Sequence, residues 1–240
     1  MKRFVQVGLL VLAGLGLLHT SLFTEEYLRY VKEGMRPLLI ASGVLLIGLG
    51  VAEAWASSSG EGHEEHGHGH DHSGVPRVAW LLFLPVLSLL FYAPPALGSY
   101  TASREPVKAV EVQEDDFDPL PATSPLPITL TEFTQRVQQD RSRAIKGRTV
   151  RMTGFVTRAD ERSWYLTRIV ISCCAADSMT LKVRVYGGAS LKADTWVTVD
   201  GTWHAGGVLG SSSAAVAVDA RRVEKVRKPS NAYMDAVPLG

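Results

Sequence analysis

The sequence has very little cysteine: two residues in 240, and these two are adjacent, Cys173 and Cys174. A disulfide framework needs cysteines spread along the chain, so that class of fold is excluded. If the two were oxidised together they would close a strained ring, because the Cα separation across a disulfide is usually longer than one peptide link allows. We therefore expect a reduced pair, or a pair that binds a metal ion.

The chain also lacks an excess of one charge and the common catalytic motifs. Lys and Arg number 25 and Asp and Glu 24, for a formal net charge of +1, which is no electrostatic footprint for nucleic acid. There is no phosphate-binding glycine loop, no Gly-x-Ser-x-Gly elbow and no His-Glu-x-x-His motif. The sequence thus predicts a protein that is not an enzyme and that has no nucleic-acid partner.

Charge is nearly absent from three long apolar runs in the first hundred residues, Phe4–Phe23, Pro37–Trp55 and Val78–Leu97. A run of about 20 apolar residues is the length that a helix needs to cross the hydrocarbon core of a bilayer. Lys2 and Arg3 precede the first run as in a signal peptide, but no small-x-small cleavage site follows it, which favours a retained anchor. We expect three transmembrane helices in contact with the membrane lipid bilayer.

The orientation of these helices rests on the basic residues around them. Lys2 and Arg3 place the N-terminus in the cytoplasm if the first helix dominates, and three spans then make the C-terminal domain extracytoplasmic. The number of Lys and Arg residues on each side of the membrane favours the opposite arrangement, because three lie on the side of the N-terminus and five on the other side. We adopt the extracytoplasmic C-terminal domain as the expectation. The residues counted are Lys2, Arg3 and Arg77 against Arg29, Lys32, Arg36, Arg104 and Lys108.

The loop between the second and third runs is rich in histidine, glycine and carboxylates. Imidazole suits divalent zinc, nickel and copper, and carboxylates add oxygen ligands. The glycines let the loop wrap around an ion without a preformed site, which suits capture or buffering more than catalysis. The alternative is a solvated polar loop without a ligand. The candidate metal ligands here are His63, His66, His68, His70 and His72.

The remainder of the chain predicts one small β domain. Thr129 and Glu132 form a capping box at the start of a helix, with Leu130, Phe133 and Val137 along one face. Five or six short strands follow, and Gly201 interrupts one of them as a bulge or a bend would. This is typical of a small all-β, OB-like barrel (oligonucleotide/oligosaccharide-binding type) with one helix, and a two-sheet sandwich is the alternative. The expected strands are Thr149–Val156, Trp164–Ser172, Thr180–Tyr186, Trp196–Trp203, Ala214–Val218 and Arg222–Val226.

These features divide the chain into four parts. Residues 1–97 form the transmembrane region, with the histidine-rich loop at 57–74, and residues 98–127 form an acidic, proline-rich linker. Residues 128–228 form the OB-like β domain, and residues 229–240 form a C-terminal tail.

The second chemical signal is the segment Ser172-Cys173-Cys174-Ala175-Ala176-Asp177, where a strand runs out into a turn. Adjacent side chains on a strand point to opposite faces, so the two sulfurs diverge unless a turn begins here. If it does, Cys173, Cys174 and Asp177 converge on one ion, and His204 is a candidate fourth ligand for zinc. The alternative is two small buried hydrophobic side chains at the end of a strand.

The chain resembles the small subunit of a bacterial two-component permease family of unknown function. The resemblance rests on the Arg168–Asp177 segment, Arg-Ile-Val-Ile-Ser-Cys-Cys-Ala-Ala-Asp, and on the Trp196–Trp203 stretch. It departs after Asp177, where this chain has Ser178-Met179 in place of a small residue with a proline nearby. The resemblance implies a bacterial inner-membrane location, a larger multi-spanning permease subunit as partner, and a link to zinc supply.

These observations lead to two hypotheses about function, together with a weaker third. The first is an accessory subunit of a membrane permease that handles Zn²⁺ or a similar divalent metal. The second is a membrane-tethered OB-like binding module that recognises a protein or envelope partner, with structural cysteines. A thiol redox protein is the third, and it needs a lowered cysteine pKa.

Overall fold

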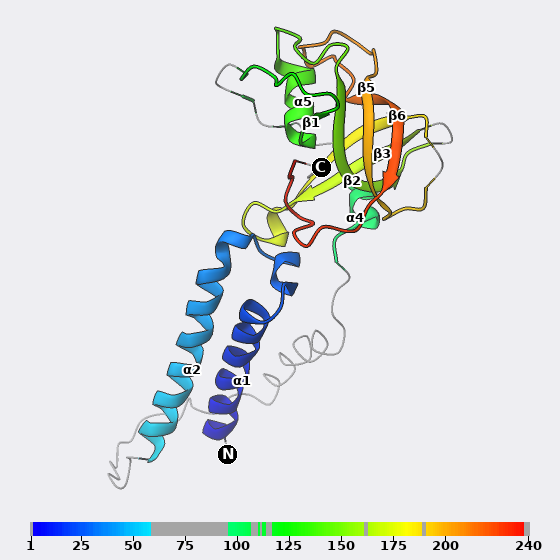
Figure 1. The fold of residues 1–240 in the computed structure, drawn as a ribbon. Coiled ribbons are helices and arrows are strands. Elements are labelled where there is room, and N and C mark those ends of the chain that lie inside the picture. The colour runs from blue at the N-terminus through cyan, green and yellow to red at the C-terminus, as the bar shows by residue number, and fades with distance from the viewer. Residues whose placement is uncertain are drawn as a thin grey trace. The chain divides into compact units, whose positions relative to one another are not determined.

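The computed structural model describes residues 2–58, 96–106, 110, 112–113, 117–160, 163–188 and 191–237. The chain forms two compact units, and each is discontinuous in sequence (Figure 1). The first unit comprises Met1–Phe23 with Pro37–Ala96, and the second comprises Thr24–Arg36 with Leu97–Gly240. The segment between the first two helices therefore belongs to the C-terminal unit.

The first unit contains helices α1 (Lys2–Leu22) and α2 (Arg36–Ser58). They approach closely at glycines: a Cβ added to Gly14 would lie 2.7 Å from the carbonyl oxygen of Gly43, and one added to Gly50 would lie 2.9 Å from a methyl group of Val11. Small residues at a contact between apolar helices allow this kind of backbone approach.

Membrane-spanning character is supported for one helix instead of the three that were expected. Among the described residues, the stretch Glu33–Ala56 is long and apolar enough to cross a membrane, with a mean hydropathy of 2.0. The apolar part of the first helix, Gln6–Leu22, is shorter and lies at the lower limit of the length that spanning requires, about 17 residues. Residues 78–95 of the third expected span lie outside the described residues, as does the histidine-rich loop.

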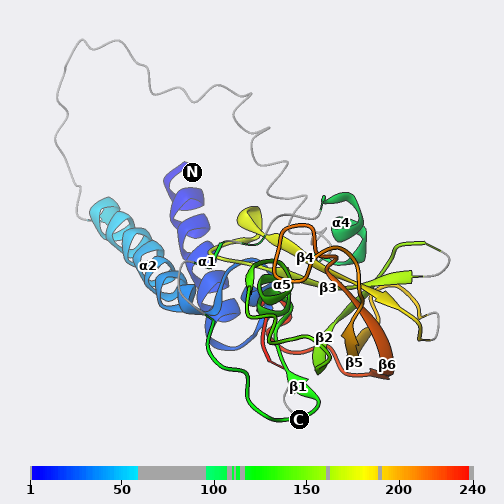
Figure 2. The same ribbon diagram turned by 90° about the horizontal axis from the view of Figure 1, so that it is seen from above.

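The C-terminal unit is built on a six-stranded mixed sheet (Figures 1 and 2). The strand order is β1-β2-β3-β4-β6-β5. A further pairing, of β2 with β5, closes the last five of these strands into a ring. β1 pairs parallel to β2 and β4 pairs parallel to β6, while the other pairs are antiparallel. The strands are β1 (Leu126–Pro127), β2 (Thr149–Arg158), β3 (Ser163–Val170), β4 (Met179–Tyr186), β5 (Trp196–Trp203) and β6 (Ala217–Lys225).

The strand pattern in the sequence anticipated this sheet closely. The fourth expected strand, Trp196–Trp203, is β5 residue for residue, and the register of β5 against β6 shifts between Asp200 and Gly201, as the interrupting glycine predicted. The two short closing strands are one strand, β6, which begins with its parallel pairing to β4 and continues along β5. The parallel pairs make the sheet mixed.

Helix α5 (Leu130–Gln139) begins where the capping residues predicted. The hydroxyl oxygen of Thr129 accepts the backbone N–H of Glu132 at 3.0 Å. Leu130, Phe133 and Val137 are fully or almost fully buried, in one core with the inward side chains of the sheet. The amphipathic face of the helix therefore closes this core.

Some described residues of the expected linker and of the expected tail pack against the unit. The linker region contributes β1 and a short helix, α4 (Ser99–Arg104), whose Ala102 has no exposed surface. In the tail, Tyr233 is 6% exposed, and Asp235 accepts the backbone N–H groups of Leu130 and Thr131 at the start of α5. Proline-rich and polar composition did not prevent packing, because a few apolar and capping side chains were sufficient.

Candidate metal centre in the cysteine loop

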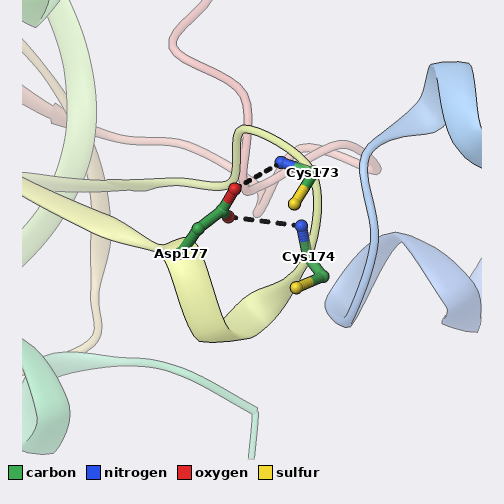
Figure 3. Close-up of side chains that lie close together, drawn as sticks. All are labelled: Cys173, Cys174 and Asp177. Carbon is green, nitrogen blue, oxygen red and sulfur yellow. Dashed lines mark hydrogen bonds between the residues drawn. The ribbon is translucent and has the colours of Figure 1, made fainter.

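Both cysteines lie in the loop that joins β3 to β4, at the end of an antiparallel pair whose last partners are Val170 and Met179. The loop contains one 3-10 turn, Ala175–Asp177, which brings the side chain of Asp177 back to the backbone of Cys173 and Cys174 (Figure 3). Cys173 is exposed and Cys174 is partly exposed, and neither forms a disulfide. The turn that convergence of the sulfurs required is therefore present, and the cysteines are not buried core residues.

The carboxylate of Asp177 organises the backbone on one side of this loop. Its Oδ2 accepts the N–H of Cys173 at 2.8 Å and its Oδ1 accepts the N–H of Cys174 at 3.2 Å (Figure 3). Its Oδ1 also accepts the N–H of Ser172, at 3.3 Å. Three consecutive backbone donors thus point at one side chain. This arrangement favours the ionised carboxylate, and it lowers the pKa of Asp177 together with a hydrogen bond from the Cys173 side chain, which is the largest cause.

The other side of the loop is held by the segment between α1 and α2. Val31 and Cys174 form an antiparallel β-bridge. The N–H of Lys32 donates to the carbonyl oxygen of Cys173 at 3.0 Å, and the N–H of Ala175 donates to the carbonyl oxygen of Tyr30 at 2.7 Å. Residues about 140 positions apart in sequence therefore form one small backbone network.

These contacts account for every backbone donor from Ser172 to Ala175, three of them through Asp177 and one through Tyr30. The carbonyl oxygens of Cys173 and Cys174 are also bonded, to the N–H groups of Lys32 and Asp177 respectively. The groups of the loop that can bind a ligand are therefore the side chains of Cys173, Cys174 and Asp177, which in this structure are hydrogen-bonded to one another and to the turn.

The metal-free thiol of Cys173 is held in its protonated form. Hydrogen bonding to Asp177, with a smaller effect of Cys174, raises the pKa of Cys173 from the ordinary 9.0 to about 11. A thiol with such a pKa is ionised to only about one part in 10⁴ at pH 7, and the thiolate is the reactive form. Cys173 therefore lacks the lowered pKa that a redox cysteine needs.

The loop does bring together a donor set for a metal ion. One sulfur from each cysteine and one carboxylate oxygen of Asp177 all lie within 4.8 Å of one another. Zinc binds thiolate sulfur at about 2.3 Å and carboxylate oxygen at about 2.0–2.2 Å, so three such atoms around one ion lie within about 4 Å of one another. The three atoms are therefore already within about 1 Å of the spacing that a bound zinc ion needs.

His204 was expected as a fourth ligand, and the structure places it elsewhere. Its ring stacks on Tyr186 with 4.1 Å between centroids, and its Nδ1 lies 2.7 Å from Oδ1 of Asp219 on β6. Tyr186 is the last residue of β4, whereas the cysteine loop precedes the first. Eight residues of strand at roughly 3.3 Å each separate the two ends, so His204 lies at the opposite end of β4 from the cysteines.

The other expected ligands, His63, His66, His68, His70 and His72, lie outside the described residues. Sequence reasoning missed the contribution of Tyr30, Val31 and Lys32. These residues act through backbone N–H and C=O groups, which all residue types except proline carry in full, so no composition or spacing marks them.

Comparison with known proteins gives a family but no activity. No protein of curated function matches the sequence. A solved structure described as an aspartyl-tRNA synthetase from Leishmania major Friedlin matches with a TM-score of 0.26 and 10% identity, over 46% of this chain and 22% of that one. A likeness this weak carries no argument.

Two family models match in succession along the chain. The model described as the DUF1980 N-terminal domain matches residues 7–108, and the one described as the DUF1980 C-terminal domain matches residues 128–234. Together they span most of the sequence, including most of α1, the whole of α2 and the whole five-stranded ring. The protein therefore belongs to the uncharacterised DUF1980 family and carries both of its domains.

Proposed function

We propose that this protein is a membrane-anchored accessory subunit of a permease, and that its C-terminal unit binds Zn²⁺ or a similar divalent ion through Cys173, Cys174 and Asp177. The observation that carries the proposal is the convergence of two sulfurs and one carboxylate oxygen within 4.8 Å. These are ligand types that zinc prefers, and the turn that gathers them is fixed by hydrogen bonds from the backbone.

The donor set favours a site that exchanges its ion over a purely structural one. Structural zinc sites have four protein ligands, whereas sites with three leave a position for water or for another molecule. The exposure of Cys173 gives such a molecule access. An accessory subunit that passes an ion to or from a larger protein needs an open position of this kind.

The packing of the C-terminal unit supports a multi-pass topology. Thr24–Arg36 joins α1 to α2 and belongs to the same compact unit as residues 97–240, so both lie on one side of any membrane that the helices cross. The chain must then cross an even number of times between Arg36 and Leu97. The second and third expected spans satisfy this condition, and an N-terminus in the cytoplasm makes the C-terminal unit extracytoplasmic.

A partner follows from the small number of spans. Three helices are too few to enclose a pore, so transport requires a larger multi-spanning subunit or several copies of this chain. The histidine-rich loop, with five histidines from His63 to His72, would concentrate ions on the opposite side of the membrane.

A membrane-tethered binding module is the second candidate, and the strand order favours it. Five ring strands joined β2-β3-β4-β6-β5, with the last pairing back to β2, have the connectivity of an OB-like barrel, although α5 precedes the ring. In such barrels the second and third strands present the binding face. Here those strands are β3 and β4, where Arg184 donates to the hydroxyl oxygen of Tyr165 at 2.7 Å.

A cobalt(II) titration of the full chain in detergent, under reducing conditions, distinguishes the two candidates. Cobalt bound by thiolates has an intense near-ultraviolet charge-transfer band, whereas cobalt bound by imidazole and carboxylate alone does not. We expect the band in the wild type and its loss in both Cys173→Ser and Cys174→Ser. A folded wild-type protein without the band would refute the cysteine site and favour the binding module as the function.

The histidine-rich loop supplies the matched control. A variant with His63, His66, His68, His70 and His72 all replaced by alanine should bind fewer cobalt ions in total and keep the thiolate band at full intensity. Zinc should displace cobalt from both proteins that retain the two cysteines, the wild type and this histidine variant, because zinc prefers a tetrahedral sulfur-containing site.

A further inference from the structure

The cysteine loop is fixed between two partners of different kinds. Asp177 belongs to the loop itself and bonds its N–H groups from within. Tyr30, Val31 and Lys32 come from a distant part of the chain and bond the carbonyl oxygen of Cys173 and the N–H of Ala175 from outside. The two cysteines lie between these outer contacts.

We propose that the segment Tyr30–Lys32 completes the metal site by holding the backbone of both cysteines in the geometry that binds the ion, so that metal occupancy and the conformation of the segment between α1 and α2 are coupled. The inference rests on the proposed metal function and adds to it a set of positioning residues and a route by which occupancy reaches the helices.

The coupling follows from where the contacts lie. The bond from Lys32 ends on the carbonyl group of Cys173, and the bond to Tyr30 begins at Ala175, the residue after Cys174. An ion that draws the two sulfurs together must act on the backbone between these points. By linkage, if the contacts with Tyr30 and Lys32 increase the affinity for the ion, the bound ion stabilises those contacts by the same free energy.

The segment itself is anchored on both sides of the bridge. Tyr27 and Leu28 are 8% and 7% exposed, so the first 3-10 turn, Glu26–Arg29, is packed in place. Beyond the bridge, the side-chain amide of Asn231 donates to the carboxylate of Glu33 at 3.2 Å. Arg36, four residues after Lys32, begins α2. A shift of the bridge therefore has a short covalent path to the start of that helix.

Lys32→Pro tests the proposal with little other disturbance. Lys32 has φ −64° and ψ 147°, which proline adopts without strain, and its predecessor Val31 is extended in the bridge, as a residue before proline prefers. The substitution removes the N–H that donates to Cys173 and places a methylene group toward that carbonyl oxygen. The carbonyl group of Lys32, which accepts from Met35, is retained.

The measurement is the cobalt affinity of the full chain in detergent, read from the thiolate band. We expect Lys32→Pro to weaken binding about tenfold, the scale seen when a group that orients metal ligands is lost. Lys32→Ala keeps the N–H and is the matched control, with wild-type affinity. Equal affinities for Lys32→Pro and wild type would overturn the inference while the metal function stood, whereas a wild type without the band would overturn the function itself.

Hydrogen exchange, with and without zinc, gives a second test that leaves the segment between α1 and α2 unchanged. Zinc should slow exchange in peptides that cover residues 24–36 as well as in those that cover the cysteine loop. In Cys173→Ser, zinc should slow exchange in neither. Protection confined to the loop in the wild type would show that the segment does not respond to the ion, and would overturn the coupling.

Discussion

Asp177 accepts the backbone N–H of Cys173 at 2.8 Å, and the same carboxylate holds the thiol of Cys173 in its protonated form. One side chain therefore shapes the loop and controls the ionisation of a candidate ligand. In the absence of metal this combination keeps Cys173 unreactive, although it is exposed. In the proposed site a metal ion would replace the thiol proton as the positive partner of the carboxylate, whereas the raised pKa makes Cys173 poorly suited to thiol redox chemistry.

The first prediction concerns thiol reactivity in protein stripped of metal with a chelator. The pKa of Cys173 is raised to about 11, chiefly by Asp177, so alkylation of wild-type Cys173 should keep accelerating well above pH 9. Asp177→Asn removes the negative charge, lowers the pKa toward 9.0 and should speed alkylation about tenfold or more at pH 8. Mass spectrometry of the labelled peptide reports the rate at each pH.

Asp219→Asn is the control for that experiment, because Asp219 is paired with His204 at the far end of β4. It should leave the rate of Cys173 alkylation unchanged. Fast alkylation of wild-type Cys173 at pH 7, at the rate of a low-pKa thiol, would contradict the raised pKa and support the thiol redox hypothesis.

The second prediction concerns protons released on metal binding. Because the pKa of Cys173 is raised, its thiol carries a proton at pH 7.5 and must lose it when the thiolate binds an ion. Calorimetric titrations of zinc in two buffers with different ionisation enthalpies should show at least one proton released per ion at the cysteine site. The apparent affinity should increase as the pH is raised from 6 to 8. Binding without proton release would mean that Cys173 is not a ligand.

The third prediction concerns the C-terminal segment, which caps α5 through Asp235. Asp235→Ala removes the acceptor for the N–H groups of Leu130 and Thr131 and for the Thr131 hydroxyl. Loss of such a cap should lower the free energy of unfolding by about 1 kcal/mol, as measured by urea unfolding followed through tryptophan fluorescence. Asp235→Asn keeps a carbonyl acceptor and should lie between the two. An alanine variant as stable as the wild type would show that residues after Met234 are a dispensable tail.

The fourth prediction concerns Gly201, where the register of β5 against β6 shifts. A Cβ at Gly201 would lie 2.6 Å from the carbonyl oxygen of Asp219, a backbone atom of the neighbouring strand that cannot move without breaking pairs. Gly201→Ala should therefore destabilise the unit by about 1–3 kcal/mol. Gly34→Ala is the matched control, because a Cβ there meets nothing within 4 Å. Equal stability of the two variants would contradict the close approach of β5 and β6.

Local features of the sequence determined most of the secondary structure. The cap at Thr129, the apolar face of α5 and the alternation along β5 each depend on neighbouring residues, and each appears in the structure as the pattern predicted. The glycine at 201 likewise marked the irregular register beside it. The cysteine loop was found for the same reason, because Cys173, Cys174 and Asp177 lie within five residues and one turn brings them together.

Contacts across the chain decided the rest. Strand order, the parallel pairing of β4 with β6 and closure through β2 and β5 depend on how the whole ring packs, which alternation in a single strand does not encode. The prediction that His204 joins the cysteines was wrong, because its ring stacks on Tyr186 at the far end of β4. Which end of β4 a residue after β5 reaches depends on how the strands pair. The bridge from Val31 to Cys174 had no sequence signal at all, since it is made by backbone groups common to every residue. The sequence by itself determined which side chains offer chemistry in the loop, and only the tertiary structure decided what holds them in place.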